Sequence, residues 1–338
     1  MSARVPTVVG MVLGEEIDRL ACDTGFSGVV SVSRGDESVL ARAYGFAHRG
    51  YGVPNTVDTR FAIASGTKGL TALVVVRLIA EGLLTLGTRA RSLLGADLPL
   101  IHDDVTVEHL LSHRSGIGDY CDEDAPPPAH PQSFTSAAAY LPALDGFPQR
   151  FPPGSQFSYN NGGFAVLALL AERATGEPFA DLVASRVVAS AGMAHTAFHR
   201  SDELPGDAAT GYLEDGRTNV FSLPVVGSGD GGIYSCADDF AAFWAALHAG
   251  RIVPPEWVSR MTAVVSAETS TRERLRYGLG FWLPPDGTTV MLEGYDYGVS
   301  FRSVSRPSDG LVFTVVSNTS EGAWPLTRWL GGELVAKG

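Results

Sequence analysis

The chain has 338 residues, of which 45% are hydrophobic and 18% charged, and this composition is sufficient for a large buried core. Its formal net charge of −12 and pI near 5.1 argue against nucleic acid or an anionic membrane surface as a partner. The three cysteines are widely spaced and form no CxxC pair, so we expect free thiols and no redox or zinc motif.

The start of the chain carries no recognisable targeting segment. Its apolar stretch, residues 8–13, is too short to span a membrane and lacks the basic start and small-residue cleavage site of a secretion signal. We therefore expect a cytoplasmic protein, or an exported one if a leader has been removed. No linker, charge block or repeat interrupts the sequence, so residues 1–338 are expected to form one unit.

Residues 14–22 have helical spacing, and a β-hairpin follows, with strands at residues 27–33 and 39–45 around a Gly35-Asp36 turn. Helices dominate the middle of the chain, and we predict them at residues 65–81, 106–112, 161–174 and 237–248. Thr106 and Ser235 are the expected caps of the second and fourth helices. Short strands then return at residues 277–283, 289–292, 299–305 and 311–316.

The distribution of these elements predicts the fold class. Strands near both chain ends, with helices between them, indicate an α/β (α+β) fold in which one antiparallel sheet is assembled from both ends and flanked by helices. We expect an α/β lobe of about residues 8–62 plus 268–338. A mostly helical lobe, about residues 63–267, would be inserted between its two parts.

Ser65 and Lys68 form the most informative local pattern. They stand three residues apart at a predicted helix start, so their side chains share one face. A serine hydroxyl is a weak nucleophile unless a base takes its proton, and the free N–H groups of a helix start favour a developing negative charge. This placement suits an acyl-transfer nucleophile, although ordinary serine usage puts a serine at this spacing before about one lysine in ten.

Lysine usage strengthens this interpretation. Lys68 and Lys337 are the two lysines among 25 basic residues. Arginine keeps its proton, whereas a buried lysine can lose it and act as a base. Because this chain uses arginine wherever charge alone is needed, we expect that Lys68 is present for its chemistry.

A second candidate element precedes the predicted helix at 161–174, where a proline-rich turn leads to a Y-x-N pattern of Tyr159 and Asn161. A turn followed by an asparagine cap explains the same residues, and both interpretations can hold together. A phenol has an ordinary pKa of about 10, so it becomes a useful base only beside a cation such as a protonated lysine. This is a physical reason for Tyr159 and Lys68 to share a pocket.

Several segments, in this order, resemble the class C β-lactamase family and its relatives among penicillin-binding proteins, DD-peptidases, family VIII esterases and D-amino-acid amidases. They are residues 61–68, with Ser65 and Lys68; residues 105–116, with Leu110-Leu111-Ser112-His113-Arg114-Ser115-Gly116; residues 151–161, with the Y-x-N pattern; Gly192-Met193 with Thr196; and residues 231–238. The resemblance extends from about residue 20 to about residue 320 and is far more specific than any single motif.

The resemblance implies a serine hydrolase that needs no metal and no cofactor. Ser65 would form an acyl-enzyme, and Lys68 and Tyr159 would share the proton transfers. Asn161 would bind the substrate amide and Lys68. The backbone N–H groups of Ser65 and Tyr295 would form the oxyanion hole.

The sequence departs from the family pattern in the segment Leu292-Glu293-Gly294-Tyr295, in which Gly294 and Tyr295 are expected to contact substrate. Leu292 stands where these enzymes carry a basic residue that holds a substrate carboxylate. Arg302 on the next strand replaces that charge only if its side chain faces the pocket; an outward side chain would be solvated. We therefore expect an esterase-like hydrolase of esters or small amides, with weak or no β-lactamase activity.

Other patterns have simpler explanations. His109 and His113 are four apart, but no third ligand accompanies them, so no metal site is predicted and His113 is expected to be buried. Residues 227–232 are rich in glycine but contain no lysine, which predicts close backbone packing near the site instead of a phosphate cradle. The acidic, proline-rich residues 119–128 are expected to form a solvated loop, or one that overhangs the site.

Two alternatives stay open. A β-lactamase or DD-peptidase would need a basic residue at Leu292, and a non-catalytic binding module on the same fold would leave Ser65, Lys68 and Tyr159 without a purpose. The expected partner is a small-molecule ester or amide. The sequence does not determine the oligomeric state.

Overall fold

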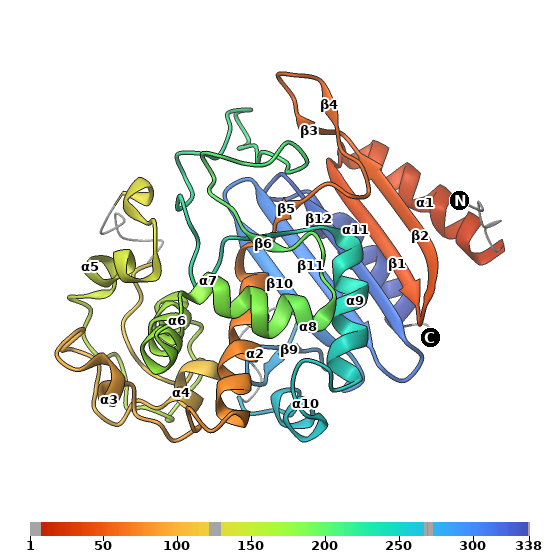
Figure 1. Ribbon diagram of the computed structural model, residues 1–338. Coiled ribbons are helices and arrows are strands. Elements are labelled where there is room, and N and C mark those ends of the chain that lie inside the picture. The colour runs from red at the N-terminus through yellow and green to blue at the C-terminus, as the bar shows by residue number, and fades with distance from the viewer. Residues whose placement is uncertain (1–7, 122–129, 267–268, 270–272, 337–338) are drawn as a thin grey trace.

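The computed structural model describes residues 8–121, 130–266, 269 and 273–336, and its largest element is a seven-stranded sheet (Figure 1). The strand order is β2-β1-β12-β11-β10-β9-β8, with antiparallel neighbours throughout. The strands are β1 (Gly28–Arg34), β2 (Glu37–Tyr44), β8 (Arg276–Tyr277), β9 (Trp282–Leu283), β10 (Val290–Asp296), β11 (Val299–Arg306) and β12 (Leu311–Ser317). Because β1 pairs with β12, the sheet joins both ends of the chain. The predicted α/β (α+β) class is confirmed.

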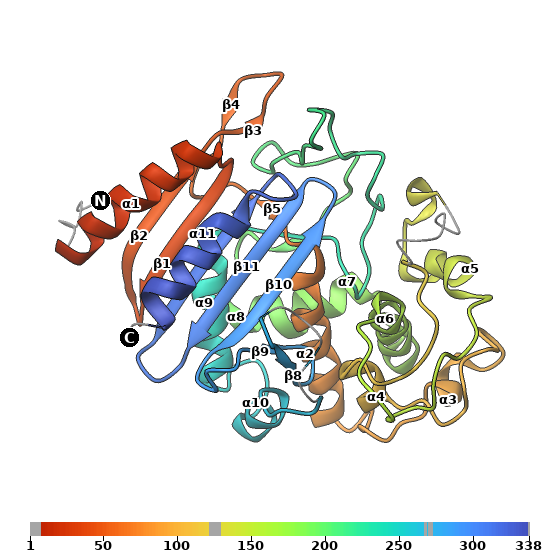
Figure 2. The same cartoon turned by 180° about the vertical axis from the view of Figure 1, so that it is seen from behind.

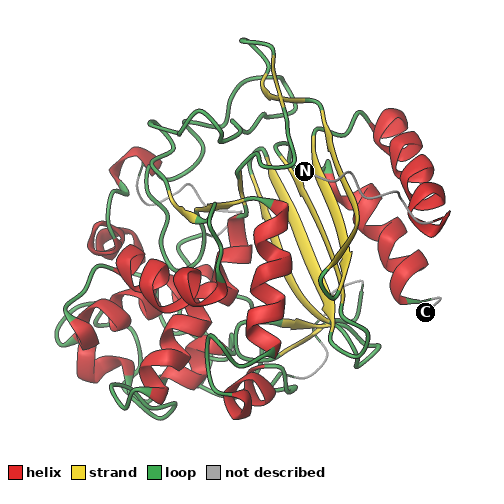
Figure 3. Ribbon diagram, turned by 45° about the vertical axis from the view of Figure 1, so that its right-hand side comes forward, coloured by secondary structure: helices red, strands yellow, loops and turns green. Residues whose placement is uncertain are grey.

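Helices cover both faces of this sheet, as the turned views show (Figures 2 and 3). One face carries α1 (Val8–Thr24) and α11 (Ala323–Leu330), and the other carries α2 (Thr67–Ala80) and α9 (Ala237–His248). Each face has its own cluster of buried apolar residues. Since both faces are covered, β12 is buried at every residue and does not alternate between apolar and polar positions.

The other helices come mainly from the middle of the chain and pack beside α2. They are α3 (Ala90–Leu94), α4 (Val107–Leu111), α5 (Leu141–Leu144), α6 (Asn161–Thr175), α7 (Phe179–Leu182), α8 (Ala189–Ala191) and α10 (Pro255–Met261). The expected cap of α4 is confirmed, because the Thr106 side chain accepts from the His109 N–H in a capping box.

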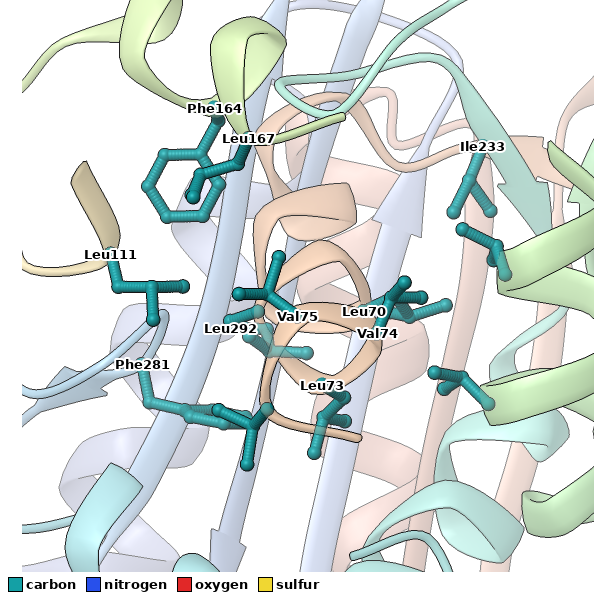
Figure 4. Packing of buried hydrophobic residues seen from close by; sticks show 14 of the residues in the cluster. Leu70, Leu73, Val74, Val75, Leu111, Phe164, Leu167, Ile233, Phe281 and Leu292 are labelled. Atoms are coloured by element: carbon teal, nitrogen blue, oxygen red, sulfur yellow. The ribbon is translucent and has the colours of Figure 1, made fainter. Parts of the chain in front are cut away.

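α2 is buried around its circumference (Figure 4). Leu73, Val74 and Val75 point in different directions from the helix axis, and all are 0% exposed. A helix without a polar face is typical of a protein core. On the sheet side, a Cβ added to Gly69 would lie 2.4 Å from Leu292 Cδ2, so α2 and β10 are in direct contact.

Two smaller sheets complete the fold. β5 (Phe61–Ala62), β7 (Ile233–Ser235) and β6 (Ala197–Phe198) form one, in the order β5-β7-β6. β3 (Phe46–His48) and β4 (Val53–Pro54) form the other. β5 leads directly into the residues before α2, so the first of these sheets positions the start of that helix.

Three local predictions were wrong. Residues 277–283 are two short strands, because the Gly278 N–H donates to the Phe281 carbonyl in a turn between them. β10 continues to Asp296, beyond the end at residue 292 that the sequence predicts. The N-cap of α9 is Cys236, because Ser235 belongs to β7.

Within the described residues, none of the helices combines the length and the apolar character that crossing a membrane would require.

The packing around α2 predicts a large difference between two leucines. Leu73→Ala should lower the free energy of unfolding by about 2–5 kcal/mol, because it removes buried methyl groups and leaves a cavity. Leu83→Ala is the matched control: Leu83 is 50% exposed, and its truncation should cost no more than about 0.5 kcal/mol. Urea unfolding with an unchanged m-value measures both, and similar losses would show that α2 is not the centre of the core.

Candidate active site

Ser65 lies in a single 3-10 turn, Ala64–Gly66, which connects β5 to α2, so it precedes the α-helix and does not belong to its first turn. Ala64 has φ +44°, in the left-handed region that non-glycine residues rarely adopt. Such a conformation persists only where packing imposes it, and β10 packs closely here. A Cβ on Gly294 would lie 2.0 Å from the Ile63 carbonyl oxygen. The turn therefore holds Ser65 between β10 and α2.

Lys68, at the start of α2, is the centre of the site. It is 2% exposed, and its Nζ donates to Ser65 Oγ at 2.9 Å, to Asn161 Oδ1 at 2.8 Å and to the Asp230 backbone carbonyl at 2.7 Å. An ammonium group has three N–H donors, and this arrangement uses all of them. A buried ammonium is tolerated only when such bonds replace its lost water.

The three partners of Lys68 differ in whether they can also donate a hydrogen bond, and this difference determines what Lys68 can do at the site. The Asp230 carbonyl and the Asn161 amide oxygen can only accept, so they hold two N–H groups of Lys68 whether or not the amine is charged. The Ser65 hydroxyl can accept or donate. When Lys68 is unprotonated, its lone pair faces Ser65 Oγ and can take the serine proton.

The glycine-rich loop at residues 227–232 brings the third partner into place. A Cβ on Gly229 would lie 2.2 Å from the Phe164 carbonyl oxygen in α6, which leaves room only for glycine. The prediction of close backbone packing near the site is confirmed. This packing carries the Asp230 carbonyl to Lys68.

Asn161 is positioned by two groups that cap α6, of which the asparagine was expected and the aspartate was not. The Asn160 side chain accepts from the Gly163 N–H. Asp119 accepts from the N–H groups of Asn161 at 2.8 Å and Gly162 at 3.0 Å. A carboxylate at a helix start also interacts favourably with the helix dipole. Asp119 is 7% exposed, so the expectation of a solvated loop is wrong at this residue; residues 122–129 lie outside the described residues.

Tyr159 packs beside Lys68, whose Nζ lies 5.0 Å from the Tyr159 ring centroid, within the range of a cation–π interaction. The Tyr159 ring is nearly parallel to that of Trp282, at 5.8 Å and 7°, and its centroid lies 4.3 Å from that of His113. Among the residues that the structure describes, the Tyr159 hydroxyl has no hydrogen-bond partner. The structure thus brings Tyr159 to Lys68 through its ring, and the Tyr159 hydroxyl makes no hydrogen bond to Ser65.

β10 contributes backbone to the site but no positive charge. Leu292 and Gly294 lie on the side of α2, whereas the Tyr295 side chain points the other way and stacks on Trp324 of α11 at 6.4 Å. Tyr295 can therefore serve the site only through its main chain. Leu292 is 2% exposed against Gly69, so core packing fills the position where a basic residue was sought.

Arg302, the other candidate cation, lies on the opposite face of the sheet. Its side chain is 11% exposed and pairs with Glu293, its partner on β10, and with Glu273 at 3.0 Å. Its guanidinium also lies 5.8 Å from the Trp324 ring centroid. Arg302 is directed away from Ser65, but it is not solvated as expected, because two carboxylates hold it beside α11.

Acidic groups lie near Lys68. The Asp230 carboxylate accepts from the Tyr120 hydroxyl at 2.5 Å, and burial raises its pKa, an effect that Lys68 opposes. Asp296 ends β10, and burial raises the pKa of its carboxyl to about 6, with Asp230 contributing in the same direction. Both carboxyls interact electrostatically with Lys68. This surrounding favours a cationic over an anionic ligand.

His109, in α4, and His113, which follows that helix, have structural roles. His113 is 1% exposed, its Nδ1 accepts from the Asn160 N–H at 3.1 Å, and burial lowers its pKa well below the ordinary value. His109 Nδ1 accepts from the Thr106 N–H. In the described ranges, no group of three metal-ligating residues includes either histidine.

Sequence reasoning missed Asp119, Asp230, Asp296 and Trp282. A usable signal existed for Asp230 and Asp296, since each is an acidic residue close to glycines in a segment already assigned to the site's surroundings. Asp119 and Trp282 reach the site through tertiary contacts that no local pattern indicates.

The cap on α6 predicts that Asp119 controls both stability and the position of Asn161. Asp119→Ala leaves two backbone N–H groups without their acceptor, and we expect the free energy of unfolding to fall by about 1–2 kcal/mol. Acylation by an ester should slow because Asn161 loses its fixed position. Asp145→Ala, at an exposed carboxylate of the same helical region, should change neither quantity. Thermal melts and single-turnover acylation rates test this, and a normal rate in Asp119→Ala would contradict it.

Three comparisons relate this chain to known proteins. The family model described as Beta-lactamase matches residues 16–334. The D-aminopeptidase of Brucella anthropi is 34% identical over 233 residues, which are 67% of this chain and 43% of that protein. Esterase EstB of Burkholderia gladioli is 31% identical over 280 residues, 71% of each chain. The crystal structure of a penicillin-binding protein from Bacillus halodurans shares 33% identity and a TM-score of 0.86, covering 94% of this chain and 98% of that one.

The family match therefore spans nearly the whole sequence, and the similar proteins include a penicillin-binding protein, an esterase and an aminopeptidase. This chain belongs to the Beta-lactamase family.

Proposed function

We propose that the protein is a serine hydrolase that acts through an acyl-enzyme on esters or small amides, esterase-like and with weak or no β-lactamase activity. The observation that carries the proposal is the hydrogen bond between Lys68 Nζ and Ser65 Oγ. Asn161 and the Asp230 carbonyl accept from the other two N–H groups of Lys68 and so orient the amine toward Ser65. Similarity to an esterase and to a D-aminopeptidase supports hydrolysis as the reaction class.

In the proposed reaction, Ser65 Oγ attacks the substrate carbonyl carbon while its proton passes to Lys68. The backbone N–H groups of Ser65 and Tyr295 stabilise the negative charge on the carbonyl oxygen. The leaving alcohol or amine takes a proton from Lys68 or Tyr159 as its bond to the carbonyl breaks. Water then attacks the acyl-enzyme and gives a proton to the Lys68 and Tyr159 pair. This proton passes to Ser65 Oγ as the bond between Oγ and the acyl carbon breaks, and the acid and free Ser65 are released.

The preference for esters over β-lactams rests on charge. Leu292 is buried against α2, and Arg302 is engaged by Glu293 and Glu273 on the far face of the sheet. Neither can hold the carboxylate of a β-lactam. Asp230 and Asp296 would repel that carboxylate, whereas an uncharged ester meets no such penalty.

A second candidate within the same chemistry is the hydrolysis of amides of amino acids that carry a free ammonium group. Asp230 and Asp296 favour it, because an ionised carboxylate near Lys68 would attract that ammonium. The similarity to the D-aminopeptidase of Brucella anthropi points the same way. We propose this as the amide branch of the activity.

The main proposal is tested with a series of p-nitrophenyl acyl esters beside a chromogenic cephalosporin. We expect ester turnover and an acyl adduct by intact mass in the wild type, and the loss of both in Ser65→Ala, by at least about a thousandfold in rate. Ser92→Ala is the matched control, because Ser92 is an exposed serine that bonds only a nearby carbonyl.

Each outcome of this series separates the alternatives. Rapid turnover of the cephalosporin would support a β-lactamase and overturn the role given to Leu292. The absence of both adduct and turnover in the wild type would favour a non-catalytic binding module.

The amide branch predicts a specific pH dependence. The Asp296 carboxyl, with a pKa of about 6, is neutral below that pH and negative above it, while a substrate α-ammonium stays charged up to a pKa of about 7.7–8.0. The ratio of kcat/KM for an amino-acid p-nitroanilide to that for its des-amino analogue should therefore rise, by up to about tenfold, as pH increases through 6. Asp296→Asn should flatten this ratio. A ratio that is flat in the wild type would rule out the carboxyl as the recognising group.

A further inference from the structure

A group of three metal-ligating side chains lies outside the catalytic centre, where the end of α8 meets the start of α9. Ligand atoms of His195, Cys236 and Asp239 all lie within 4.8 Å of one another. Cys236 and Asp239 are three apart at a helix start and so share one face. His195 follows α8, which packs against α9 (Figure 1). Cys236 and Asp239 are buried, and the His195 side chain is 40% exposed, which leaves a way in from solvent.

The two carboxylate oxygens of Asp239 have different surroundings. Oδ2 accepts from the His195 backbone N–H at 2.8 Å and from the Thr196 hydroxyl at 2.6 Å, and these bonds fix the turn after α8 against α9. Oδ1 lies 3.8 Å from His195 Nδ1, which is too far for a hydrogen bond. One oxygen therefore maintains the structure, and the other remains available to a ligand.

Cys236 is an unusual residue for its position. It is the N-cap of α9, where serine, threonine, aspartate or asparagine is preferred, and its sulfur faces the backbone N–H groups of Asp238 and Asp239. Burial raises the pKa of this thiol to about 12, and the charge of Asp239 acts in the same direction. Asp238 adds a second carboxylate beside it. Within the described residues, no lysine or arginine forms an ion pair with Asp238 or Asp239.

We propose that His195 Nδ1, Cys236 Sγ and Asp239 Oδ1 bind one zinc ion, with solvent as its fourth ligand. Zinc takes nitrogen, sulfur and oxygen ligands at about 2.0–2.3 Å in a tetrahedron, so ligand atoms about 3.5 Å apart are needed and small side-chain rotations supply them. Binding forms a zinc–sulfur bond and releases the thiol proton to solvent. Affinity therefore rises with pH.

This zinc ion would stabilise the end of β7, which pairs with β5, the strand that leads to Ser65. Ser235, next to Cys236, pairs with Phe61 of β5, and the Ile63 N–H donates to the Ile233 carbonyl of β7. β5 then runs into the turn that carries Ser65. The site is thus separate from the reacting groups but is joined to them through the backbone.

The test is zinc titration of the full chain against a chromophoric chelator, combined with thermal melts. Cys236→Ser introduces a better helix cap, and His195→Ala keeps the backbone N–H that Asp239 binds, so both variants should fold. We expect one equivalent of zinc in the wild type, with a melting temperature about 2 °C higher when zinc is in excess. Both variants should bind at least about tenfold more weakly.

Two matched controls carry the same chemical changes elsewhere: Cys22→Ser, at an exposed thiol, and His102→Ala, at an exposed imidazole. They should bind zinc as the wild type does. A wild type that takes up no zinc, or wild-type affinity in either Cys236→Ser or His195→Ala, would overturn the proposal. Ester turnover plays no part in this readout, so a failure of the proposed function would leave it unaffected.

Discussion

The architecture of this protein depends on one buried amine. Lys68 of α2 reaches Asn161 at the start of α6 and the carbonyl of Asp230 in the glycine-rich loop, so one side chain links the three segments. Removing one partner of a buried charge typically costs about 3–5 kcal/mol. Any movement of α6 or of the loop away from α2 would therefore leave one N–H group of Lys68 without its acceptor. The bonds on which the proposed chemistry depends also hold α2, α6 and the glycine-rich loop together.

Small residues around Lys68 make this arrangement possible. Gly66 and Gly69 let Phe301 and Leu292 approach α2, and Gly294 lets β10 lie against the Ile63 carbonyl. The close approach has a chemical consequence, because a strand this near to the helix has no space for a long basic side chain at Leu292. The substrate preference proposed here is thus linked to how tightly the sheet and α2 pack.

Local sequence patterns predicted the parts of the site that local structure determines. Ser65 and Lys68 are three residues apart, and Asn161 opens a helix with a clear cap signal, so short-range rules were sufficient. Asp119 was expected in a solvated loop because its role depends on α6. The first residue of α6, Asn161, lies 42 positions further along the chain. The turn between β8 and β9 and the N-cap at Cys236 were missed for the same reason: the strand pairing that defines them is tertiary. The fold class could be predicted from the order of the elements. The environment of Arg302 could not, because it depends on the carboxylates that neighbouring segments place beside it.

The pairing of β1 with β12 has a consequence for how the chain folds. The Ser27 hydroxyl donates to Asn318, 291 positions further along, so the centre of the sheet closes only after almost the whole polypeptide is available. Contacts between such distant residues slow folding, because a long loop must be closed before they form. During synthesis on the ribosome, the hairpin of β1 and β2 would form before β12 is available, and the edge of β1 would stay unpaired until then. An unpaired strand edge of this kind can pair with another chain, so the late closure of the sheet exposes the nascent protein to aggregation.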